Sequence, residues 1–515
     1  MAIRLLIRAA LLGTSLVILA SCGGGTPLNP VDPDGPPPPT SSTPPTPFLI
    51  GNTGIDRARA ITIDAAGAIW VAGSFEGTVD FDPSTATTVP RTSLGGSDLF
   101  VATYSTSGAL IRVVTFGGTG EDRISALRVD ASGSAWIGGA VSNGYLCPGI
   151  GTTTTVLGAT DLFVARLDPS GTCQWIAVAG ASGEDEVLGL ALDAAGNVGV
   201  TGAVSGAADF DPSAAVAVPV QPYGGGGSDL FLASYGPSGA YRFAVTIGNE
   251  GAERGESVVS DAAGDFYIST TFTGTIDTDP TVGTRLLETT GGSDGLLARY
   301  SASGALVWSG RLGGIDNDEA TAALTVVGTE LVAGLTVRGV ADLDPGPGVS
   351  SLQAQGGTDA VIARYALATG ALTQAPLLLG GVADDAVRSI AATSTGALAV
   401  AGRYAGTIDL DPTNGVLTLQ SSQGGGLTEA FHLVLGASGT PVWAAAVGNG
   451  SLTSGTLLAE SAGLVPASDG TFWAALSLFG VVDADPAPMS LVALAPLGNG
   501  DGAVLRYSAT GALQR

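Results

Sequence analysis

The sequence has no lysine, a single histidine and only three cysteines, and charged residues make up 13% of its 515 positions. Beyond residue 20 it also lacks an apolar run near the roughly 18 residues that a membrane-spanning helix needs. The one histidine, His432, lies in the apolar run FHLVL, where a packed histidine is the ordinary case. The sequence therefore argues against a histidine-ligated metal and against a Ser-His-Asp triad.

Positive charge is scarce, with 20 arginines against 46 acidic residues and a formal net charge of -26. Nucleic-acid binding requires clustered cations, so we expect no nucleic-acid partner. In an exported protein acidity first serves solubility. Cation binding and a basic partner are its two functional interpretations, and composition does not choose between them.

The N-terminus predicts export. Residues 1–22 place Arg4 and Arg8 ahead of an apolar stretch and end in LASC, which is typical of a secretory signal. This end resembles the lipobox of bacterial lipoproteins, which implies cleavage before Cys22 and lipid attachment to it. Gly23 after the cysteine then implies the outer membrane or cell surface of a Gram-negative bacterium, with the membrane contacted through the lipid alone. Residues 23–47 form a Pro-rich spacer, and residues 48–515 form the folded part.

Two motifs recur seven times each and interleave. One begins with DLFVATYSTSGA at residue 98 and returns every 63 to 72 residues, and the other begins with ITIDAAGAIWVAGSF at residue 61. Each unit contains four strand-like runs, with short Gly-bearing turns inside two hairpins. The pattern predicts an all-β fold, a seven-bladed β-propeller of four-stranded antiparallel blades.

The two ends of the folded part complement each other. The last unit stops five residues into its fourth strand at GALQR, and the first begins with PFLIGNTG, which matches the rest of that strand. An open ring would leave an unpaired strand edge. We therefore expect the N- and C-terminal segments to pair in one blade and close the ring.

The pattern GG-x-G-x-D…D-x-x-G-x-x-x-V-x-G…D-x-F-V-A-R-Y-x-x-S-G is legible at residues 117–139 and 161–175. It resembles the bacterial β-propeller repeats called SBBP repeats, over nearly all of the chain after the spacer. The resemblance implies a propeller on an exported or surface protein. It implies no activity and no catalytic residue.

Six units carry the motif D-x-D-P after their second strand-like run, and two carboxylates at i and i+2 of an extended chain face one side. One hypothesis is a Ca²⁺ site, because Ca²⁺ takes six to eight oxygen ligands. The other is that each Asp accepts backbone N–H bonds and caps a turn. The pairs are Asp80 and Asp82, Asp209 and Asp211, Asp277 and Asp279, Asp342 and Asp344, Asp409 and Asp411, and Asp483 and Asp485.

The crossovers between units are acidic as well, and topology puts them at the same end of the ring as the D-x-D-P loops. We therefore expect one strongly acidic face. The crossover acids are Glu121 and Asp122, Glu184 to Glu186, Glu250 and Glu253, Asp316, Asp318 and Glu319, and Asp384 and Asp385.

Cys147 and Cys173 are an even pair in an oxidising compartment, so a disulfide is possible. Geometry argues against it, because the two lie at opposite ends of a blade, and seven strand residues span about 23 Å. The bond forms only if the loop returns along the blade edge. The six Trp residues recur at two positions of the repeat, which favours packing between blades over a sugar-stacking platform.

These patterns predict a non-catalytic binding or scaffolding module whose partner is an envelope protein or a polysaccharide. A Ca²⁺-dependent adhesin-like or polysaccharide-binding module is one alternative. A carboxylate-based glycan hydrolase or lyase is the other, and it requires two acids from nonequivalent positions in a pocket at the ring centre. No cofactor other than Ca²⁺ is indicated.

Overall fold

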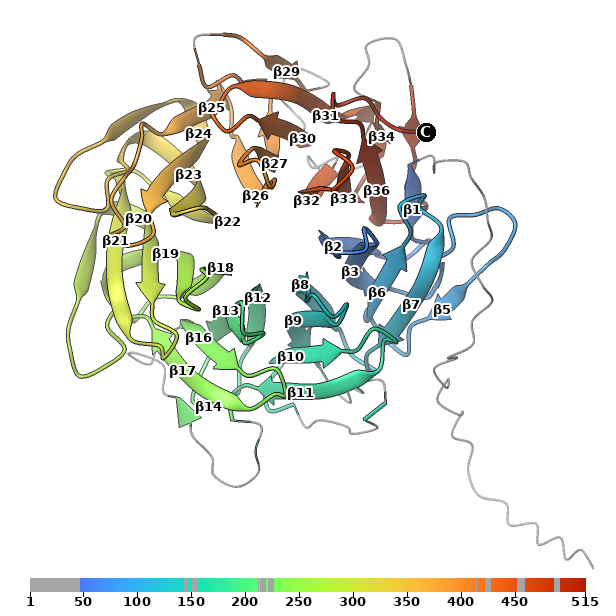
Figure 1. The fold of residues 1–515 in the computed structure, drawn as a ribbon, viewed down its shortest axis with the longest axis horizontal. Coiled ribbons are helices and arrows are strands. Elements are labelled where there is room, and N and C mark those ends of the chain that lie inside the picture. The colour runs from blue at the N-terminus through green and yellow to red at the C-terminus, as the bar shows by residue number, and fades with distance from the viewer. Residues whose placement is uncertain are drawn as a thin grey trace, which may run out of the picture.

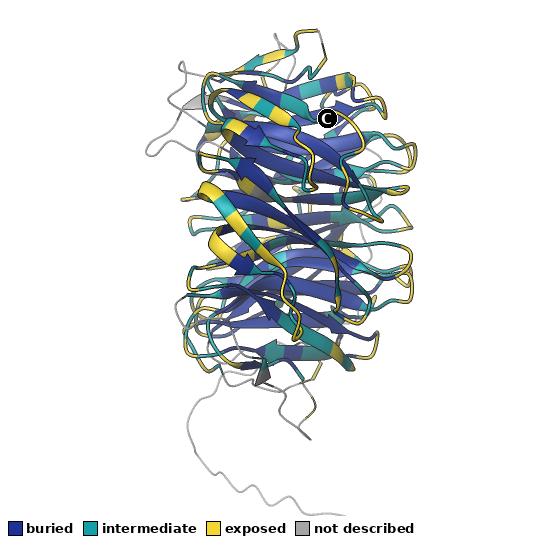
Figure 2. Cartoon of the chain, turned by 90° about the vertical axis from the view of Figure 1, so that its left-hand side faces the viewer, coloured by how far each residue is buried: buried dark blue, intermediate teal, exposed yellow. Residues whose placement is uncertain are grey.

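A computed structural model describes residues 47–142, 147, 149–150, 156–211, 213, 219–220, 227–413, 415–421, 428–451, 459–485 and 491–515. Across these ranges every regular element is a strand, and four-stranded antiparallel sheets stand around a central opening (Figure 1). Viewed from the side, the buried positions follow the strands, and the exposed positions gather at the loops (Figure 2). The described residues contain no helix long and apolar enough to cross a membrane. The signal segment, with Cys22, lies outside them.

The first sheet shows the unit. It contains, from the centre outward, β2 (Arg57–Ile63), β3 (Ile69–Phe75), β6 (Asp98–Tyr104) and β7 (Leu110–Phe116), paired antiparallel in that order. All seven residues of β3 and of β6 are buried, because the neighbouring sheets cover both faces of these middle strands. The turn glycines Gly67 and Gly108 have φ of 86° and 76°, a conformation that favours glycine.

The same antiparallel order recurs along the chain. The next two sheets contain β8 (Arg123–Val129), β9 (Ala135–Val141), β10 (Asp161–Leu167) and β11 (Cys173–Ala179), and β12 (Glu186–Leu192), β13 (Val198–Val204), β16 (Asp229–Tyr235) and β17 (Tyr241–Ile247). Then follow β18 (Arg254–Ser260), β19 (Phe266–Asp277), β20 (Leu286–Tyr300) and β21 (Leu306–Gly314), and β22 (Glu319–Val327), β23 (Glu330–Asp342), β24 (Ser351–Ala366) and β25 (Leu377–Gly381). The last groups are β26 (Ala386–Ala392), β27 (Leu398–Ala405), β30 (Thr428–Leu435) and β31 (Pro441–Ser451), and β32 (Ala459–Pro466), β33 (Phe472–Leu478), β36 (Asp501–Tyr507) and β1 (Phe48–Ile50).

The last group joins the two ends of the described chain. β1 pairs antiparallel with β36, with Phe48 opposite Val504 and Ile50 opposite Gly502. The first strand is thus the outer strand of a sheet whose other members come from the C-terminal region (Figure 1). Phe48 also contacts Tyr104 of the first sheet, with ring centroids 4.8 Å apart.

Short hairpins project from the sheets after the second strand of most units, and they carry the D-x-D-P motifs. They are β4 (Thr78–Asp80) with β5 (Pro90–Thr92), β14 (Ala208–Asp209) with β15 (Pro219–Val220), β28 (Thr407–Asp409) with β29 (Thr418–Gln420), and β34 (Val481–Asp483) with β35 (Ala493–Leu494). In the fourth unit the extended ends of β19 and β20 form the equivalent hairpin, and in the fifth unit the extended ends of β23 and β24 form it.

The outer-strand tryptophans pack between neighbouring sheets. A Cβ added to Gly370 would lie 2.8 Å from the ring of Trp308, and one added to Gly511 would lie 2.8 Å from the ring of Trp443. In both cases the glycine belongs to the outer hairpin of the next unit along the chain. These rings bury apolar area between units, as packing predicts.

Cys147 and Cys173 form a disulfide with a Cα–Cα distance of 5.8 Å. The objection that the two lie at opposite ends of a blade is therefore wrong. A Cβ on Gly149 would lie 2.5 Å from the Thr172 side chain, so this part of the long loop runs back to the outer hairpin. Both cysteines are buried in one apolar cluster with Leu167.

Candidate functional site

Each innermost strand departs from regular pairing at the same place. In β2 the register shifts between Ala58 and Ala60, which leaves Arg59 as an extra residue. Such a β-bulge turns a side chain out of the ordinary alternation. The corresponding bulged residues in four sheets are Ser125, Leu188, Glu256 and Arg388, and in the C-terminal sheet Ala462. In β22 the shift falls between Ala320 and Leu324.

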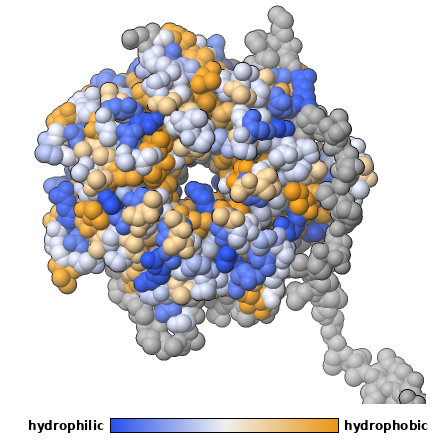
Figure 3. Space-filling model, in the orientation of Figure 1, coloured by the Kyte–Doolittle hydropathy of each residue, from blue (hydrophilic) through white to orange (hydrophobic). Residues whose placement is uncertain are grey.

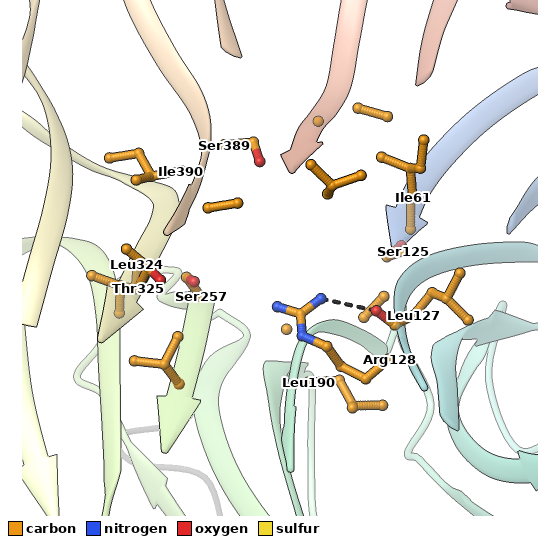
Figure 4. A pocket seen from close by; sticks show the side chains of 18 of the residues that line it. Ile61, Ser125, Leu127, Arg128, Leu190, Ser257, Leu324, Thr325, Ser389 and Ile390 are labelled. Atoms are coloured by element: carbon orange, nitrogen blue, oxygen red, sulfur yellow. Dashed lines mark hydrogen bonds between the residues drawn. The ribbon is translucent and has the colours of Figure 1, made fainter. Parts of the chain in front are cut away.

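These six bulged side chains all line one cavity of about 630 Å³ at the centre of the sheets. The space-filling view shows the opening in this face (Figure 3), and the close-up shows side chains from several innermost strands pointing into it (Figure 4). Its volume lies within the roughly 300–1,000 Å³ of small-molecule pockets. Apolar walls come from Ile61, Leu190 and Ile390, and hydroxyl groups from Ser125, Ser257 and Ser389.

The charged side chains that line the cavity are three arginines, Arg59, Arg128 and Arg388, and two glutamates, Glu256 and Glu460. This lining is basic in balance although the whole chain carries a charge of -26. None of the three arginines has a carboxylate within 4 Å among the described residues. The guanidinium of Arg128 donates to the Leu127 carbonyl at 2.9 Å (Figure 4).

Two more arginines lie beside this group. Burial and then the charge of Arg59 lower the pKa of Arg57, and burial and then the charge of Arg388 lower the pKa of Arg403. Glu460 acts in the opposite direction on both, so Arg57 and Arg403 both lie near it. Burial raises the pKa of Glu256, although Arg254 and Arg388 oppose this.

A smaller pocket of about 200 Å³ is lined by Glu186, Arg123 and Arg254. Glu186 accepts from Arg123 at 3.0 Å, from Arg254 at 3.2 Å and from the Ser125 hydroxyl at 2.6 Å. Burial opposes ionisation of Glu186, but these donors outweigh it and lower its pKa. The group is a satisfied ion-pair network.

The D-x-D-P aspartates accept backbone hydrogen bonds. Asp80 Oδ1 accepts from the N–H of Asp82 at 3.1 Å and of Val89, across the hairpin, at 2.8 Å. Oδ1 accepts the corresponding two backbone hydrogen bonds at Asp277, Asp342, Asp409 and Asp483. Asp209 accepts one, from the N–H of Asp211. Asp82, Asp211, Asp279, Asp344 and Asp411 each accept from the N–H two residues ahead at 2.9 Å, and Asp485 pairs with Arg515 at 2.6 Å.

This geometry is that of a nested turn cap, in which Oδ1 of the aspartates accepts backbone N–H groups. Within the described ranges no group of three or more His, Cys, Asp or Glu residues is arranged to hold a metal ion. In three units the first Asp also lies opposite a glycine of the preceding unit, as Asp342 does with Gly313. The motif therefore ties neighbouring units together.

In four units a tyrosine at the end of the third strand forms a hydrogen bond to the D-x-D-P motif of the same unit. The sequence analysis did not predict this contact. The Tyr300 hydroxyl donates to the carbonyl of Thr278, the middle residue of its D-x-D-P, at 2.8 Å. Tyr104, Tyr235 and Tyr365 make the same bond to Phe81, Phe210 and Leu343. The sequence held only a partial signal, because the second unit lacks both the motif and the tyrosine (Leu167), whereas the sixth unit keeps the motif with Leu435 at the tyrosine position.

Many crossover acids are not on the surface, so the expectation of a strongly acidic face needs correction. Glu121, Glu184, Glu250 and Asp384 are exposed. Glu186 is buried in the ion-pair network described above, and five others are buried as well: Asp122, Asp185, Glu253, Asp318 and Asp385. Each of these five lies just before or at the start of an innermost strand, next to the buried acid that opens the third strand of the preceding unit.

The pair formed by Asp98 and Asp122 shows the arrangement. A Cβ on Gly117 would lie 2.5 Å from Asp98 Oδ1 and 2.9 Å from Asp122 Oδ2, so the two oxygens face a common point. Asp122 accepts from the N–H groups of Gly118 and Ser142, at 2.7 and 2.8 Å. Asp98 Oδ1 has no partner among the described residues. Burial raises the pKa of each to about 6.

His432 is fully buried, and its ring nitrogens contact the Tyr507 hydroxyl at 3.1 Å and the Ser461 hydroxyl at 3.0 Å. Burial lowers its pKa to about 3. The ring is neutral at physiological pH and is part of the packing.

No protein-family profile and no curated protein matches the chain. Among solved structures, it is similar to the quinohemoprotein alcohol dehydrogenase of Comamonas testosteroni, with 8% identity over 88% of this chain and 70% of that one and a TM-score of 0.37. It is also similar to the rhamnogalacturonan lyase YesW (11% identity, 90% and 91% covered, TM-score 0.27) and to a rhamnogalacturonan lyase of Bacillus licheniformis (11% identity, 90% and 91% covered, TM-score 0.25). Similarity this weak carries no argument about activity.

Proposed function

We propose that the protein is an exported, non-catalytic β-propeller that binds a ligand at the centre of its ring. In this proposal the ring is closed and has seven blades of the SBBP-repeat type. Cys22 carries a lipid, and residues 23–47 tether the propeller to the outer membrane or cell surface of a Gram-negative bacterium. The ligand is an envelope component, either a protein or a polysaccharide.

One observation carries the proposal. Strands, turn glycines, capping aspartates and anchoring tyrosines repeat from unit to unit, whereas the bulged residues at the centre are Arg59, Ser125, Leu188, Glu256, Arg388 and Ala462. Positions that only maintain the fold are expected to repeat in such an array. A ring of unlike side chains around one cavity is what recognition of a specific ligand requires.

The test blocks the cavity in the full chain, exported and purified in detergent. Ala462→Trp and Leu188→Trp place bulk on two different strands of the lining, and Val282→Trp, at a fully exposed position, is the matched control. We expect the two cavity variants to lose binding of the parent cell's envelope polysaccharide and protein fractions, and the control to retain it. Wild-type binding by both cavity variants, with wild-type melting temperatures, would refute a central ligand site.

A carboxylate-based glycan hydrolase or lyase is a second candidate, and one observation favours it. Glu256 and Glu460 line the same cavity from nonequivalent positions, since Glu256 is a bulged residue and Glu460 precedes the bulge of its strand by two. Glycoside hydrolysis uses two carboxyl groups, one as general acid and the other as base or nucleophile. The test is release of reducing ends or unsaturated products from acidic glycans, with Glu256→Gln and Glu460→Gln as the abolishing variants.

The Ca²⁺-dependent adhesin-like or polysaccharide-binding module, with the D-x-D-P aspartates as ligands, is a separate prediction that does not depend on the central cavity. The geometry of the carboxylates favours the capping hypothesis instead, because their Oδ1 atoms accept backbone N–H groups.

A further inference from the structure

We infer that the end of the cavity formed by the last residues of the innermost strands binds the carboxylate of an organic acid with an apolar body, and that Arg128 holds this carboxylate. The inference rests on the proposed function, because it places the ligand in the same central cavity. It adds the chemical class of the group that this end recognises and the residue that recognises it.

The register of the innermost strands separates the charged residues of the cavity into two levels. Arg59, Glu256 and Arg388 are bulged residues, and Glu460 precedes the bulge of its strand by two positions. Arg128 instead follows the bulge of β8 by three residues, which is about 10 Å along a strand. Among the described residues that line the cavity, Arg128 is therefore the one charged residue of its end.

The wall around Arg128 is mostly apolar. β22 contributes Thr325 and Val326 to this end, and the hydroxyl of Ser260 donates to a backbone carbonyl of β12 at 2.9 Å. In the close-up, Arg128 extends into the opening between the innermost strands, and Thr325 lies on another strand of the wall (Figure 4). The cavity-lining residues three positions after the bulge in four other sheets are Ala191, Val259, Ala391 and Val465.

The guanidinium of Arg128 has no carboxylate partner. Its Nη1 donates to the carbonyl of Leu127, on its own strand, and no ion pair within 4 Å forms in the described part of the chain. The side chain is open to the cavity, but protein surrounds the cavity, and burial lowers the pKa of Arg128. An arginine stays protonated even so, and charges enclosed by protein are usually paired. In a chain with 46 acidic residues, an enclosed arginine without one is unexpected.

The chemistry of this end matches a monovalent carboxylate. A guanidinium has five N–H donors in a planar fork, and it binds a carboxylate through two parallel hydrogen bonds. The bond to Leu127 uses one donor, so a full edge of the fork is free for the ligand. A doubly charged phosphate would need a second cation, which the described residues of this end do not supply. The apolar wall favours a hydrocarbon body over a hydroxylated one. A free carboxylic acid carries this group, and so does the C-terminus of an apolar peptide.

The experiment is calorimetric titration of the detergent-purified full chain with the straight-chain acids from butanoate to octanoate, octanamide and inorganic phosphate. Titration into detergent alone corrects for partition into micelles. We expect octanoate to bind, and affinity to rise about fourfold per methylene group along the series because each one buries more apolar surface. Octanamide should bind at least about tenfold more weakly than octanoate, because it lacks the charge-assisted bonds.

Two variants test the role of Arg128. Arg128→Gln should weaken octanoate binding about tenfold or more and leave octanamide binding unchanged, a difference that general damage to the cavity would not produce. Arg285→Gln is the matched control, because Arg285 also donates to a backbone carbonyl and has no ion pair among the described residues. It lies next to the projecting hairpin of the fourth unit and should bind octanoate as the wild type does.

A pentapeptide that ends in leucine separates the two sources of the carboxylate. It is titrated with a free and with an amidated C-terminus. Binding of the free form but not of the amidated form supports the chain end of a protein as the ligand. Binding of octanoate without binding of either peptide supports a free acid.

The outcomes also separate this inference from the proposed function. Absence of binding by octanoate and by the free peptide, equal affinities for octanoate and octanamide, binding of phosphate alone, or wild-type affinity in Arg128→Gln would each overturn the inference. If Arg128→Gln did not fold, the comparison of octanoate with octanamide on the wild type would decide. If Ala462→Trp abolished capture of envelope material while octanoate and the peptide failed to bind, the central site would stand without an acid-binding end.

Discussion

Replacing Asp98 by asparagine should stabilise the protein at pH 8 and by only about half as much at pH 5. Asp98 is buried, its Oδ2 accepts from the Leu94 N–H at 3.0 Å, and its Oδ1 faces Asp122 without a partner among the described residues. An asparagine in the same position keeps the oxygen on Leu94 and directs an amide N–H at Asp122.

The pKa values give the sign and the magnitude of the expected change in unfolding free energy. The pKa of Asp98 rises from an ordinary value of 3.8 to about 6. A carboxyl group whose pKa is raised on folding stabilises the native state fully below its unfolded pKa, and this stability is lost as the pH rises through the folded value. Two units correspond to about 3 kcal/mol at about 1.4 kcal/mol per unit. Only the shift of Asp98 is counted, because the substitution removes that carboxyl group alone.

The assay is thermal unfolding between pH 4.5 and 8.5. At about 2 cal/mol/K of unfolding entropy per residue, a gain of about 3 kcal/mol in the folded part raises the melting temperature by about 3 °C. Glu250→Gln, an exposed acid on another crossover, is the control and should shift nothing at either pH. Equal shifts of Asp98→Asn at pH 5 and pH 8, or destabilisation at pH 8, would refute a raised pKa of Asp98 in the folded state.

Four further outcomes follow from the structure. Wild-type protein should melt higher near pH 5 than near pH 8.5, because burial also raises the pKa of Glu253 to about 7 and that of Asp385 to about 8. Cys173→Ser should cost roughly 3 kcal/mol of unfolding free energy, since the disulfide closes a loop over a separation of 26 residues. Tyr300→Phe should cost about 1–3 kcal/mol by leaving the buried Thr278 carbonyl without its donor. Millimolar Ca²⁺ or EDTA should leave the melting temperature unchanged, because the D-x-D-P carboxylates already accept backbone N–H groups.

Each of these has a contrary result that would count against it. A melting temperature that rises steadily with pH would contradict the raised pKa values. Two free thiols in the exported protein, measured by mass spectrometry, would contradict the disulfide. Chemical denaturation of Tyr300→Phe with a wild-type midpoint would contradict the anchoring bond, and a Ca²⁺-dependent rise in melting temperature would restore the metal hypothesis.

The sequence alone was enough for the local architecture. Seven-residue apolar runs and turn glycines recur at fixed offsets, so strand order within a unit followed from hairpin chemistry that acts over a few residues. The overlap between PFLIGNTG and the missing end of the last unit indicated the pairing that is seen between β1 and β36. The capping alternative for D-x-D-P was available because an Asp at i bonds to the N–H at i+2.

Only the tertiary structure decided the centre of the molecule. A one-residue bulge reverses which side chains of a strand face the cavity, and period-two alternation in the sequence does not show where the bulge falls. Arg59 and Arg388 therefore looked like ordinary strand residues until the sheets were placed around the cavity. The disulfide was likewise decided by the path of a long loop, whose course no local rule fixes.

The buried acids also show which properties the sequence determines and which the tertiary structure decides. Asp122 and Glu121 are adjacent in the sequence and equally charged, yet one is buried against Asp98 and the other faces solvent. Solvation depends on which strands cover a residue, and these come from 20 or more positions away, as Ser142 does for Asp122. Composition determined that the protein is acidic. Packing determined which of its acids are buried and which of its arginines line the cavity.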